Sequence, residues 1–246
     1  MADHLRFKLE HYVRLSADDR EDLAALEQSN VRTIAARRDI IHEGEHPEFV
    51  NLVLDGWAIR HKTLVDGRRQ ILALLLPGDL CDLNVFLLRG VDHSIGALTP
   101  VTVAQIPREL MDDIEKKRSP LFQALTLDLL VQLAIQRQWT LNLGQRSAME
   151  RISHLICELF ARLAAVGLCR NGTCHIPITQ TDLSEATGIT PVHVNRTVQE
   201  LRGQGLIDWK GREIHVADMS ALRRVAMFND NYLHLGREGA NLDAND

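Results

Sequence analysis

The sequence predicts an α+β chain with an N-terminal antiparallel β-barrel or jelly roll, a long helix and a C-terminal winged helix-turn-helix. Three observations lead to this prediction. Turn residues recur about every ten residues between 31 and 107, a heptad pattern occupies 120–143, and two short helical patterns with a hairpin occupy 179–216. We place the domain boundaries at 1–118, 119–144 and 145–246.

The first part of the chain is interpreted as a short helix followed by strands. Ser16 can cap a helix that extends to Glu27. Gly, Pro and Asp residues then interrupt short apolar runs, as expected for the turns of an antiparallel sheet. These turns fall at Gly44-Glu45, Asp55-Gly56, Asp66-Gly67, Pro77-Gly78-Asp79 and Leu98-Thr99-Pro100. The clearest hairpin turn is Asp66-Gly67.

Two helices are expected next. Residues 108–117 predict the first, and Pro120 begins a longer one that reaches about Leu143. Six side chains of the longer helix recur at the spacing of a coiled-coil seam: Leu125, Leu129, Gln132, Gln136, Trp139 and Leu143. A second stripe consists of Leu127, Leu130 and Ala134. We expect the two faces to contact the chain's own sheet and a second subunit; burial within one chain is the alternative.

Residues 179–203 predict a helix-turn-helix. Thr179 can cap the first helix with Asp182 as its capping-box partner, and Gly188 can end that helix in a left-handed conformation. Thr190 is the next N-cap, and Pro191 follows at the first helical position. The inward side of the second helix would be formed by Val194, Val198 and Leu201.

The remaining C-terminal segments frame this motif. Gly144 is a candidate hinge before a helix predicted at 148–166. Leu206-Ile207 and residues 213–216 flank a turn at Lys210-Gly211, a pattern typical of a wing. A last helix is expected over 219–235, and the tail over 236–246 is expected to be disordered.

The outward face of the second helix carries side chains that suit DNA recognition: Val192, His193, Asn195, Arg196 and Gln199. Arg can bind guanine O6 and N7 together, Asn or His can reach a base edge or a phosphate, and Val can contact a thymine methyl. We expect Arg196 to read a base with help from its neighbours His193, Val192 and Asn195. Phosphates would be positioned by Gln180, Thr190 and Gln199. Two core helices joined by a Gly turn are the alternative.

Composition indicates no membrane segment. The 246 residues carry a formal charge of −5, and the longest apolar run, Ile71 to Leu76, is too short to cross a bilayer. The N-terminus lacks the apolar segment of a signal peptide, and four scattered cysteines form no disulfide framework, so we expect a cytoplasmic protein. Residues 176–216 carry four Lys or Arg and five Asp or Glu. We therefore expect modest non-specific DNA affinity and a dimer that doubles the contacts.

Three groups of side chains suggest other chemistry but have simpler interpretations. Residues 42–46, HEGEH, match a zinc motif that requires a helix, whereas Gly44 and Pro47 predict a turn. Cys169 and Cys174-His175 lack a full set of metal ligands, so we expect loop thiols. We expect Arg60, Lys62, Arg68 and Arg69 to form a solvated strand face; gripping an anionic effector is the alternative.

Cys81 is the best redox candidate by position. The neighbouring carboxylate of Asp82 should, however, raise the pKa of its thiol and slow oxidation. The sequence shows no catalytic Ser/His/Asp set and no nucleotide loop, so we do not expect an enzyme.

The order of these elements resembles the Crp/Fnr superfamily of bacterial transcription regulators over nearly the whole chain. The matching segments are 41–45, 53–56, 76–80 and 179–207. The resemblance implies a cyclic-nucleotide-binding-like sensor domain and a homodimer. It further implies that the dimer binds a palindromic operator in double-stranded DNA, contacts RNA polymerase and acts as activator or repressor.

The chain departs from the cyclic-AMP receptors where the resemblance would place the effector. Their phosphate-binding Glu and Arg-Ser pair match Asp82, His93 and Ser94, and their Thr-Ser pair on the long helix matches Gln136-Arg137. A His cannot replace the two charge-assisted bonds that Arg makes to a phosphate. We therefore expect an effector other than cyclic AMP. Its candidate pocket is formed by Asp82, His93, Ser94 and Gln136.

Two further departures concern the cofactor and the operator. The oxygen-sensing members hold an iron–sulfur cluster on N-terminal cysteines, but no cysteine precedes Cys81, so we expect no such cluster. The cofactor stays unknown, and no metal is assigned. The usual Arg-Glu at the start of the reader helix is Pro191-Val192 here, while a later Arg is kept as Arg196. The half-site should therefore differ from the familiar ones.

Two other functions stay open from the sequence. The same fold could act as a ligand or redox sensor mainly through protein contacts, or the barrel could be a metal enzyme, although an H-x-H cluster is absent. The favoured hypothesis is a dimeric, sequence-specific DNA-binding transcription regulator.

Overall fold

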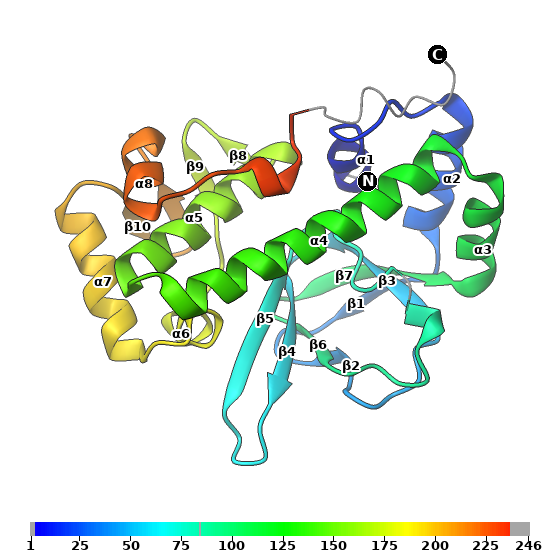
Figure 1. Cartoon of the computed structure of the whole chain (residues 1–246). Helices are drawn as coiled ribbons and strands as arrows, with labels where there is room; N and C mark the ends of the chain where they lie inside the picture. The colour runs from blue at the N-terminus through cyan, green and yellow to red at the C-terminus, as the bar shows by residue number, and fades with distance from the viewer. Residues whose placement is uncertain (1–2, 84, 237–246) are drawn as a thin grey trace.

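The computed structural model describes residues 3–83 and 85–236 and confirms the predicted order of a β-sheet domain, a long helix and a winged helix-turn-helix (Figure 1). The N-terminal part contains α1 (His4–Leu9), α2 (Ala17–Gln28), β1 (Val31–Ile34), β2 (Asp39–Ile41), β3 (Phe49–Asp55), β4 (Ala58–Thr63), β5 (Arg69–Leu75), the 3-10 turn η1 (Val85–Leu87), β6 (Ser94–Ala97) and β7 (Val101–Pro107). The predicted N-cap at Ser16 is confirmed, and Asp19 completes a capping box that was not predicted. The short helix α1 was not predicted.

Seven strands form two antiparallel sheets with the orders β1-β7-β3 and β2-β6-β4-β5. Side chains from both sheets bury against one another, among them Val53 and Val103 from the first and Leu75 and Ile95 from the second. This arrangement confirms the predicted antiparallel sheets. The hairpin between β4 and β5 projects from the body of the molecule, and Gly67 supplies the positive φ of 85° that its turn requires (Figure 1).

The helices α3 (Arg108–Lys117) and α4 (Pro120–Gln145) follow, and α4 crosses the whole molecule from α2 to α6 (Gln180–Thr187) (Figure 1). Gly144 lies inside α4, so the helix continues past the predicted hinge. The predicted seam is buried within the chain only in part. Leu125 and Trp139 are buried within the chain, whereas Leu130 and Leu133 are 54% and 48% exposed. Leu143, which also belongs to the seam, is 41% exposed, so one end of the seam is open while its middle packs within the chain.

The C-terminal part contains α5 (Ala148–Ala165), β8 (Cys169–Arg170), β9 (Thr173–His175), α6 (Gln180–Thr187), α7 (Pro191–Gly203), β10 (Asp208–Lys210), β11 (Glu213–His215), α8 (Met219–Ala226) and the turn η2 (Asn231–Leu233). The four short strands form one sheet in the order β10-β11-β9-β8, so the predicted wing is extended by a second hairpin. The first wing strand begins at Asp208, two residues later than the predicted Leu206.

The last helix ends earlier than expected. Met227 adopts a left-handed conformation with φ 47°, and the Phe228 N–H bonds back to the Arg223 carbonyl. The break lets the Phe228 ring pack edge-on against His154 at 5.0 Å. Tertiary packing therefore overrides the helical pattern. The predicted disordered tail lies, apart from Gly236, outside the described residues. None of the described helices is long and apolar enough to span a membrane.

Candidate nucleic-acid interface and sensor site

The first helix of the reader, α6, begins and ends as the sequence predicts. The Thr179 hydroxyl accepts a bond from the Asp182 N–H at 3.1 Å, and the Asp182 carboxylate accepts one from the Thr179 N–H at 2.9 Å. Gly188 ends the helix with φ 67°. The Ser184 hydroxyl then donates to the Ile189 carbonyl at 2.6 Å, which fixes the turn between the two helices. Local hydrogen bonds therefore hold the start of α6 and the turn that leads to the second helix.

The second helix, α7, is anchored by one side and exposed on the other. Thr190 caps it by accepting from the His193 N–H at 3.3 Å, and Pro191 takes the first position. Val194 and Leu201 are fully buried. All five side chains predicted for the outward face are exposed: Val192, His193, Asn195, Arg196 and Gln199. Within residues 3–83 and 85–236, Arg196 has no ion-pair partner, so its guanidinium is available to a ligand.

Two grooves border this face. One, of about 610 Å³, separates the sensor-domain turns at Arg37 and Pro100 from Gln180, Gln199 and Arg212. The other, of about 470 Å³, runs between α7 and the wing. Gln180 and Gln199 therefore line a hollow next to the exposed helix. Thr190 lies at the start of α7 and is exposed.

In the β-sheet domain, the structure brings Asp82 and His93 into direct contact. Arg60, one of the four basic strand residues for which gripping an anion was the alternative, contacts both of them. The Arg60 Nη2 lies 3.0 Å from Asp82 Oδ1 and also donates to the Cys81 carbonyl. Asp82 Oδ2 lies 3.0 Å from His93 Nε2, and Asp92 Oδ1 lies 2.8 Å from His93 Nδ1. The Arg60 guanidinium is therefore already paired within the chain, with Asp82 and the Cys81 carbonyl as its partners.

His93 titrates between two carboxylates. Burial alone would lower its pKa, but the hydrogen bonds to Asp82 and Asp92 outweigh burial and raise the pKa above the ordinary value. The Nε2 atom also lies 3.1 Å from Arg60 Nε. That contact needs an unprotonated Nε2, whereas the bond to Asp82 needs a protonated one. Protonation of His93 therefore favours Asp82 over Arg60 as its partner.

The other two candidate effector residues lie apart from this cluster. The Ser94 hydroxyl accepts a bond from the Glu43 N–H at 3.0 Å. Gln136 on α4 donates to the Leu72 carbonyl of β5 at 2.7 Å. Both side chains therefore hold the sensor domain together, at its edge and against α4. Among the residues that the structure describes, no three His, Cys, Asp or Glu side chains are grouped so as to hold a metal ion.

Two of the four basic strand residues are not solvated as predicted. Arg60 is largely buried at the Asp82 cluster, and Arg69 pairs with Glu185 of α6 at 2.7 Å. Lys62 and Arg68 are exposed as expected. Lys62 forms an ion pair with Glu43, and Arg68 forms one with Asp66. A bulge at Arg60 and His61 breaks the alternation of β4, so simple in-out alternation could not place Arg60.

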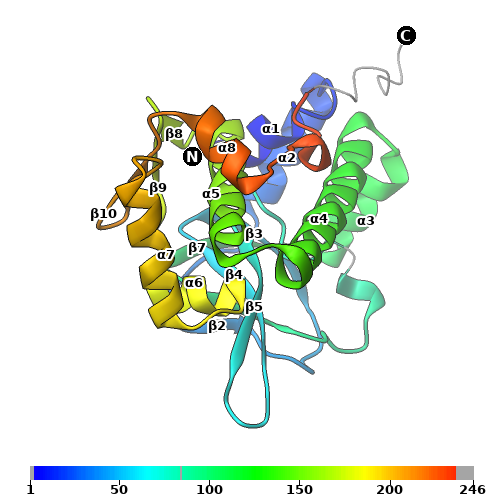
Figure 2. The same cartoon turned by 60° about the vertical axis from the view of Figure 1, so that its left-hand side comes forward.

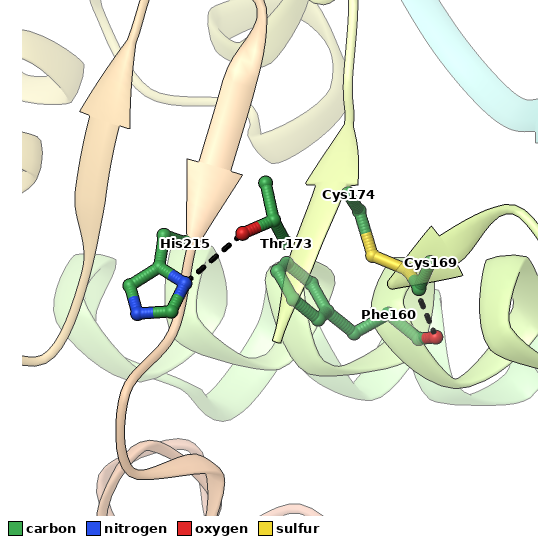
Figure 3. Close-up of a disulfide and its surroundings, with 5 residues drawn as sticks. All are labelled: Phe160, Cys169, Thr173, Cys174 and His215. Carbon is green, nitrogen blue, oxygen red and sulfur yellow. Dashed lines mark hydrogen bonds between the residues drawn. A yellow bond between two sulfur atoms is a disulfide. The ribbon is translucent and has the colours of Figure 1, made fainter. Parts of the chain in front are cut away.

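The prediction of free thiols at 169 and 174 was wrong. Cys169 and Cys174 lie opposite each other on β8 and β9 and form a disulfide (Figure 3). The sequence signal was present in Asn171-Gly172, the favoured pair for a two-residue hairpin turn, which places the two cysteines in register.

Cys81 and Cys157 are free and buried. Burial, with Asp82 beside it, raises the pKa of the Cys81 thiol as expected, and burial raises that of Cys157 to about 12.

A buried charge cluster connects the N-terminal helix, the sensor domain, α4 and the reader domain. The Lys8 ammonium lies 2.8 Å from Asp79 and 2.7 Å from Asp128 of α4. Arg162 of α5 lies 2.7 Å from Asp79 and 3.4 Å from Glu158. Burial alone would raise the pKa of Asp79, but Lys8 and Arg162 lower it. Sequence patterns did not reveal this cluster, because its members are far apart in the chain.

Comparison with known proteins settles the family. Residues 31–118 match the cyclic nucleotide-binding domain, and residues 150–225 match the Crp-like helix-turn-helix domain. The chain is 32% identical over 209 residues to the transcriptional activator protein FnrL of Cereibacter sphaeroides, covering 83% of this chain and 84% of that protein. The chain belongs to the Crp/Fnr family. It is accordingly a DNA-binding transcription regulator of the Crp/Fnr type and not an enzyme.

Other members of the Crp/Fnr family support the same placement. The nitrogen fixation regulation protein FixK of Bradyrhizobium diazoefficiens is 30% identical over 179 residues, 73% of this chain and 72% of that protein. The solved structure of FixK2 from Bradyrhizobium japonicum superposes with a TM-score of 0.72 at 25% identity, over 80% of this chain and 96% of that one. The predicted fold class, an α+β sensor domain with a long helix and a winged reader, is therefore confirmed.

Proposed function

We propose that this Crp/Fnr regulator binds a palindromic DNA operator as a homodimer and reads each half-site through α7. The observation that carries the proposal is the two-sided character of that helix. Its inward side is fixed by Val194 and Leu201, while the exposed side offers Arg196 with no ion-pair partner among the described residues. A rigid helix with an available guanidinium suits a two-bond contact with guanine.

The neighbouring side chains supply supporting contacts. Val192 is 73% exposed at the start of α7 and suits a thymine methyl, with His193 and Asn195 beside it. Gln180, Thr190 and Gln199 are neutral hydrogen-bonding groups suited to phosphates. Because residues 176–216 carry a net charge of −1, non-specific attraction is weak, and two linked readers are needed.

Helix α4 supplies the dimer contact in this proposal. Leu130, Leu133 and Leu141 are 54%, 48% and 43% exposed on one long helix, although large apolar side chains are normally covered. A second copy of the same helix would bury them in a coiled-coil-like contact. In functional terms we retain the division into sensor (1–118), dimerisation helix (119–144) and reader (145–246).

The sensor domain of this protein takes an effector other than cyclic AMP, or none. Arg60, Asp82 and His93 are already paired with one another, and an incoming phosphate would have to displace Asp82 from Arg60. RNA polymerase is the further partner that the family suggests.

Selection of random duplex DNA by the purified protein near physiological salt tests the proposal. Enrichment of a palindrome with half-sites about one helical turn apart supports it. Absence of enrichment, both alone and with a small-molecule cell extract, would overturn it and favour a sensor that acts through protein contacts.

A further inference from the structure

We propose that Cys169 and Cys174 are a reversible dithiol–disulfide couple that sets the rigidity of the wing sheet and, through it, the affinity for DNA. The first half of the proposal stands on the hairpin alone. The second half rests on the proposed function.

The hairpin holds the two sulfur atoms together in either oxidation state. Cys169 and Cys174 are direct partners across β8 and β9, with Cα atoms 4.6 Å apart, the separation of a non-hydrogen-bonded antiparallel pair and within the range that a disulfide spans. Asn171 and Gly172 form the two-residue turn with φ of 49° and 70°, as a type I′ turn requires. Backbone pairing therefore juxtaposes the thiols before any bond forms.

This hairpin is part of the sheet that carries the wing. Cys174 pairs with Ile214 of β11, and both side chains are buried. The Val216 N–H donates to the Gly172 carbonyl at 2.9 Å, and the Ile176 N–H to the Arg212 carbonyl at 2.7 Å. The Thr173 hydroxyl and His215 Nδ1 form a hydrogen bond of 3.0 Å between β9 and β11 (Figure 3). Loosening β8 and β9 would therefore loosen the strand that supports the wing.

The bond acts locally. It closes a short loop, and β8 is a two-residue edge strand that pairs with β9 alone among the described strands. Without the bond, a strand of this length has little to hold it, because a two-stranded hairpin is marginal on its own. Oxidation should therefore preorganise the wing, and preorganised surfaces bind more tightly.

Access to the couple is one-sided. Cys169 is half-buried, whereas Cys174 is 1% exposed, so Cys169 is the more accessible of the two to an external reagent. On oxidation by hydrogen peroxide, both S–H bonds break and one S–S bond forms. The two protons and two electrons convert one peroxide molecule into two waters. A dithiol reductant reverses the change by attacking Cys169 and taking the disulfide into its own ring.

The test uses the full chain after peroxide or dithiothreitol treatment. Alkylation and mass spectrometry should count four thiols in the reduced protein and two in the oxidised one. Amide hydrogen exchange over 213–216 should be slower after oxidation. The Kd for a selected duplex should be about threefold lower or better after oxidation. Cys169→Ser, at the more exposed position, should behave as the reduced protein in either condition, and Cys157→Ala should respond as the wild type.

Four thiols after peroxide, or equal exchange at 213–216 in both states, would overturn the couple. Two thiols with slower exchange but equal Kd would overturn its link to DNA while leaving the proposed function intact. Failure to select any duplex in either state, with and without the small-molecule cell extract, would overturn the proposed function and the link to DNA. The thiol count and the exchange rates would still decide whether the couple exists.

Discussion

The guanidinium of Arg37, in the turn between β1 and β2, forms a two-pronged ion pair with the carboxylate of Asp182 on α6. Its Nη2 lies 2.9 Å from Asp182 Oδ2, and Nη1 faces Oδ1. Asp182 is also the capping-box partner of Thr179. One carboxylate thus fixes the start of the first reader helix and ties that helix to the sensor domain. Figure 2 shows α6 lying against the β-sheet domain beside β5.

Replacing Arg37 by Gln should weaken this connection. The Asp182 side chain is 1% exposed and would lose two charge-assisted bonds, although Thr179 would still bind it. Because the Arg37 side chain is 46% exposed, we expect a loss of only about 1 kcal/mol in the free energy of unfolding, measured with urea. Arg38→Gln, on the exposed neighbour, is the matched control. Equal curves for the two variants would show that the pair contributes nothing.

The same pair should make stability depend on acid pH. Burial alone would raise the pKa of Asp182, but the bonds from Arg37 and Thr179 lower it below the ordinary value. A carboxyl group with a lowered folded pKa contributes stability above its unfolded pKa of about 3.9, and loses it as pH falls through the folded pKa. The pH dependence of unfolding below about pH 4 should therefore be shallower in Arg37→Gln. An unchanged slope would contradict this assignment.

Lys8 should contribute strongly to the free energy of unfolding, although it lies near the N-terminus. Lys8→Met leaves Asp79 and Asp128 buried without their shared cation, so we expect a loss of about 3–5 kcal/mol. Urea unfolding measures it, with exposed Lys116→Met as the control. Adding Asp128→Asn should recover part of the loss. A loss no larger than that of the control would show that the cluster does not hold the domains together.

The stability that His93 contributes should depend on pH in the opposite sense to that contributed by Asp182. Its pKa is raised in the folded protein by Asp82 and Asp92 against the effect of burial. Its stabilising contribution is therefore complete below the unfolded pKa of about 6.5 and is lost as pH rises through the folded pKa. Stability measured from about pH 6 upward should fall in the wild type and be flatter in His93→Gln. NMR titration of the His93 ring should give a pKa above about 6.5, and a lower one would refute the prediction.

The α4 surface gives a prediction about assembly. Leu133→Glu places a charge on a side chain that is 48% exposed, so the single chain should still fold, while a helix–helix contact would be disrupted. Sedimentation should then show a dimer for the wild type and a monomer for the variant. Leu87→Glu, 81% exposed on η1, serves as the control for added charge. A dimeric Leu133→Glu protein would place the contact elsewhere.

The sequence predicted the features that depend on a few neighbouring residues. Capping at Ser16 and Thr179 needs only a hydroxyl and a carboxylate three residues later, and the turns at Gly67 and Gly188 need a positive φ that glycine adopts freely. The exposed face of α7 follows from the period of Val194, Val198 and Leu201. Local chemistry and periodicity are enough for such elements.

The sequence could not predict contacts between residues far apart in the chain. Arg37 meets Asp182 across 145 positions, and Lys8 meets Asp79 across 71. Nothing near Arg60 indicated that its guanidinium would pair with Asp82, 22 positions away. The seam of α4 shows a related limit: apolar periodicity indicates that Leu125 and Trp139 are buried, but not which partner buries them.

The most direct measurement is the affinity of Arg196→Ala for the selected operator and for a duplex with the half-site guanines replaced. The account predicts that the variant loses about 1–3 kcal/mol on the operator and little on the altered duplex, with unchanged thermal unfolding. Arg224→Ala on α8, also exposed, should match the wild type. Equal loss on both duplexes, or no loss on either, would contradict the claim that α7 reads a base through Arg196.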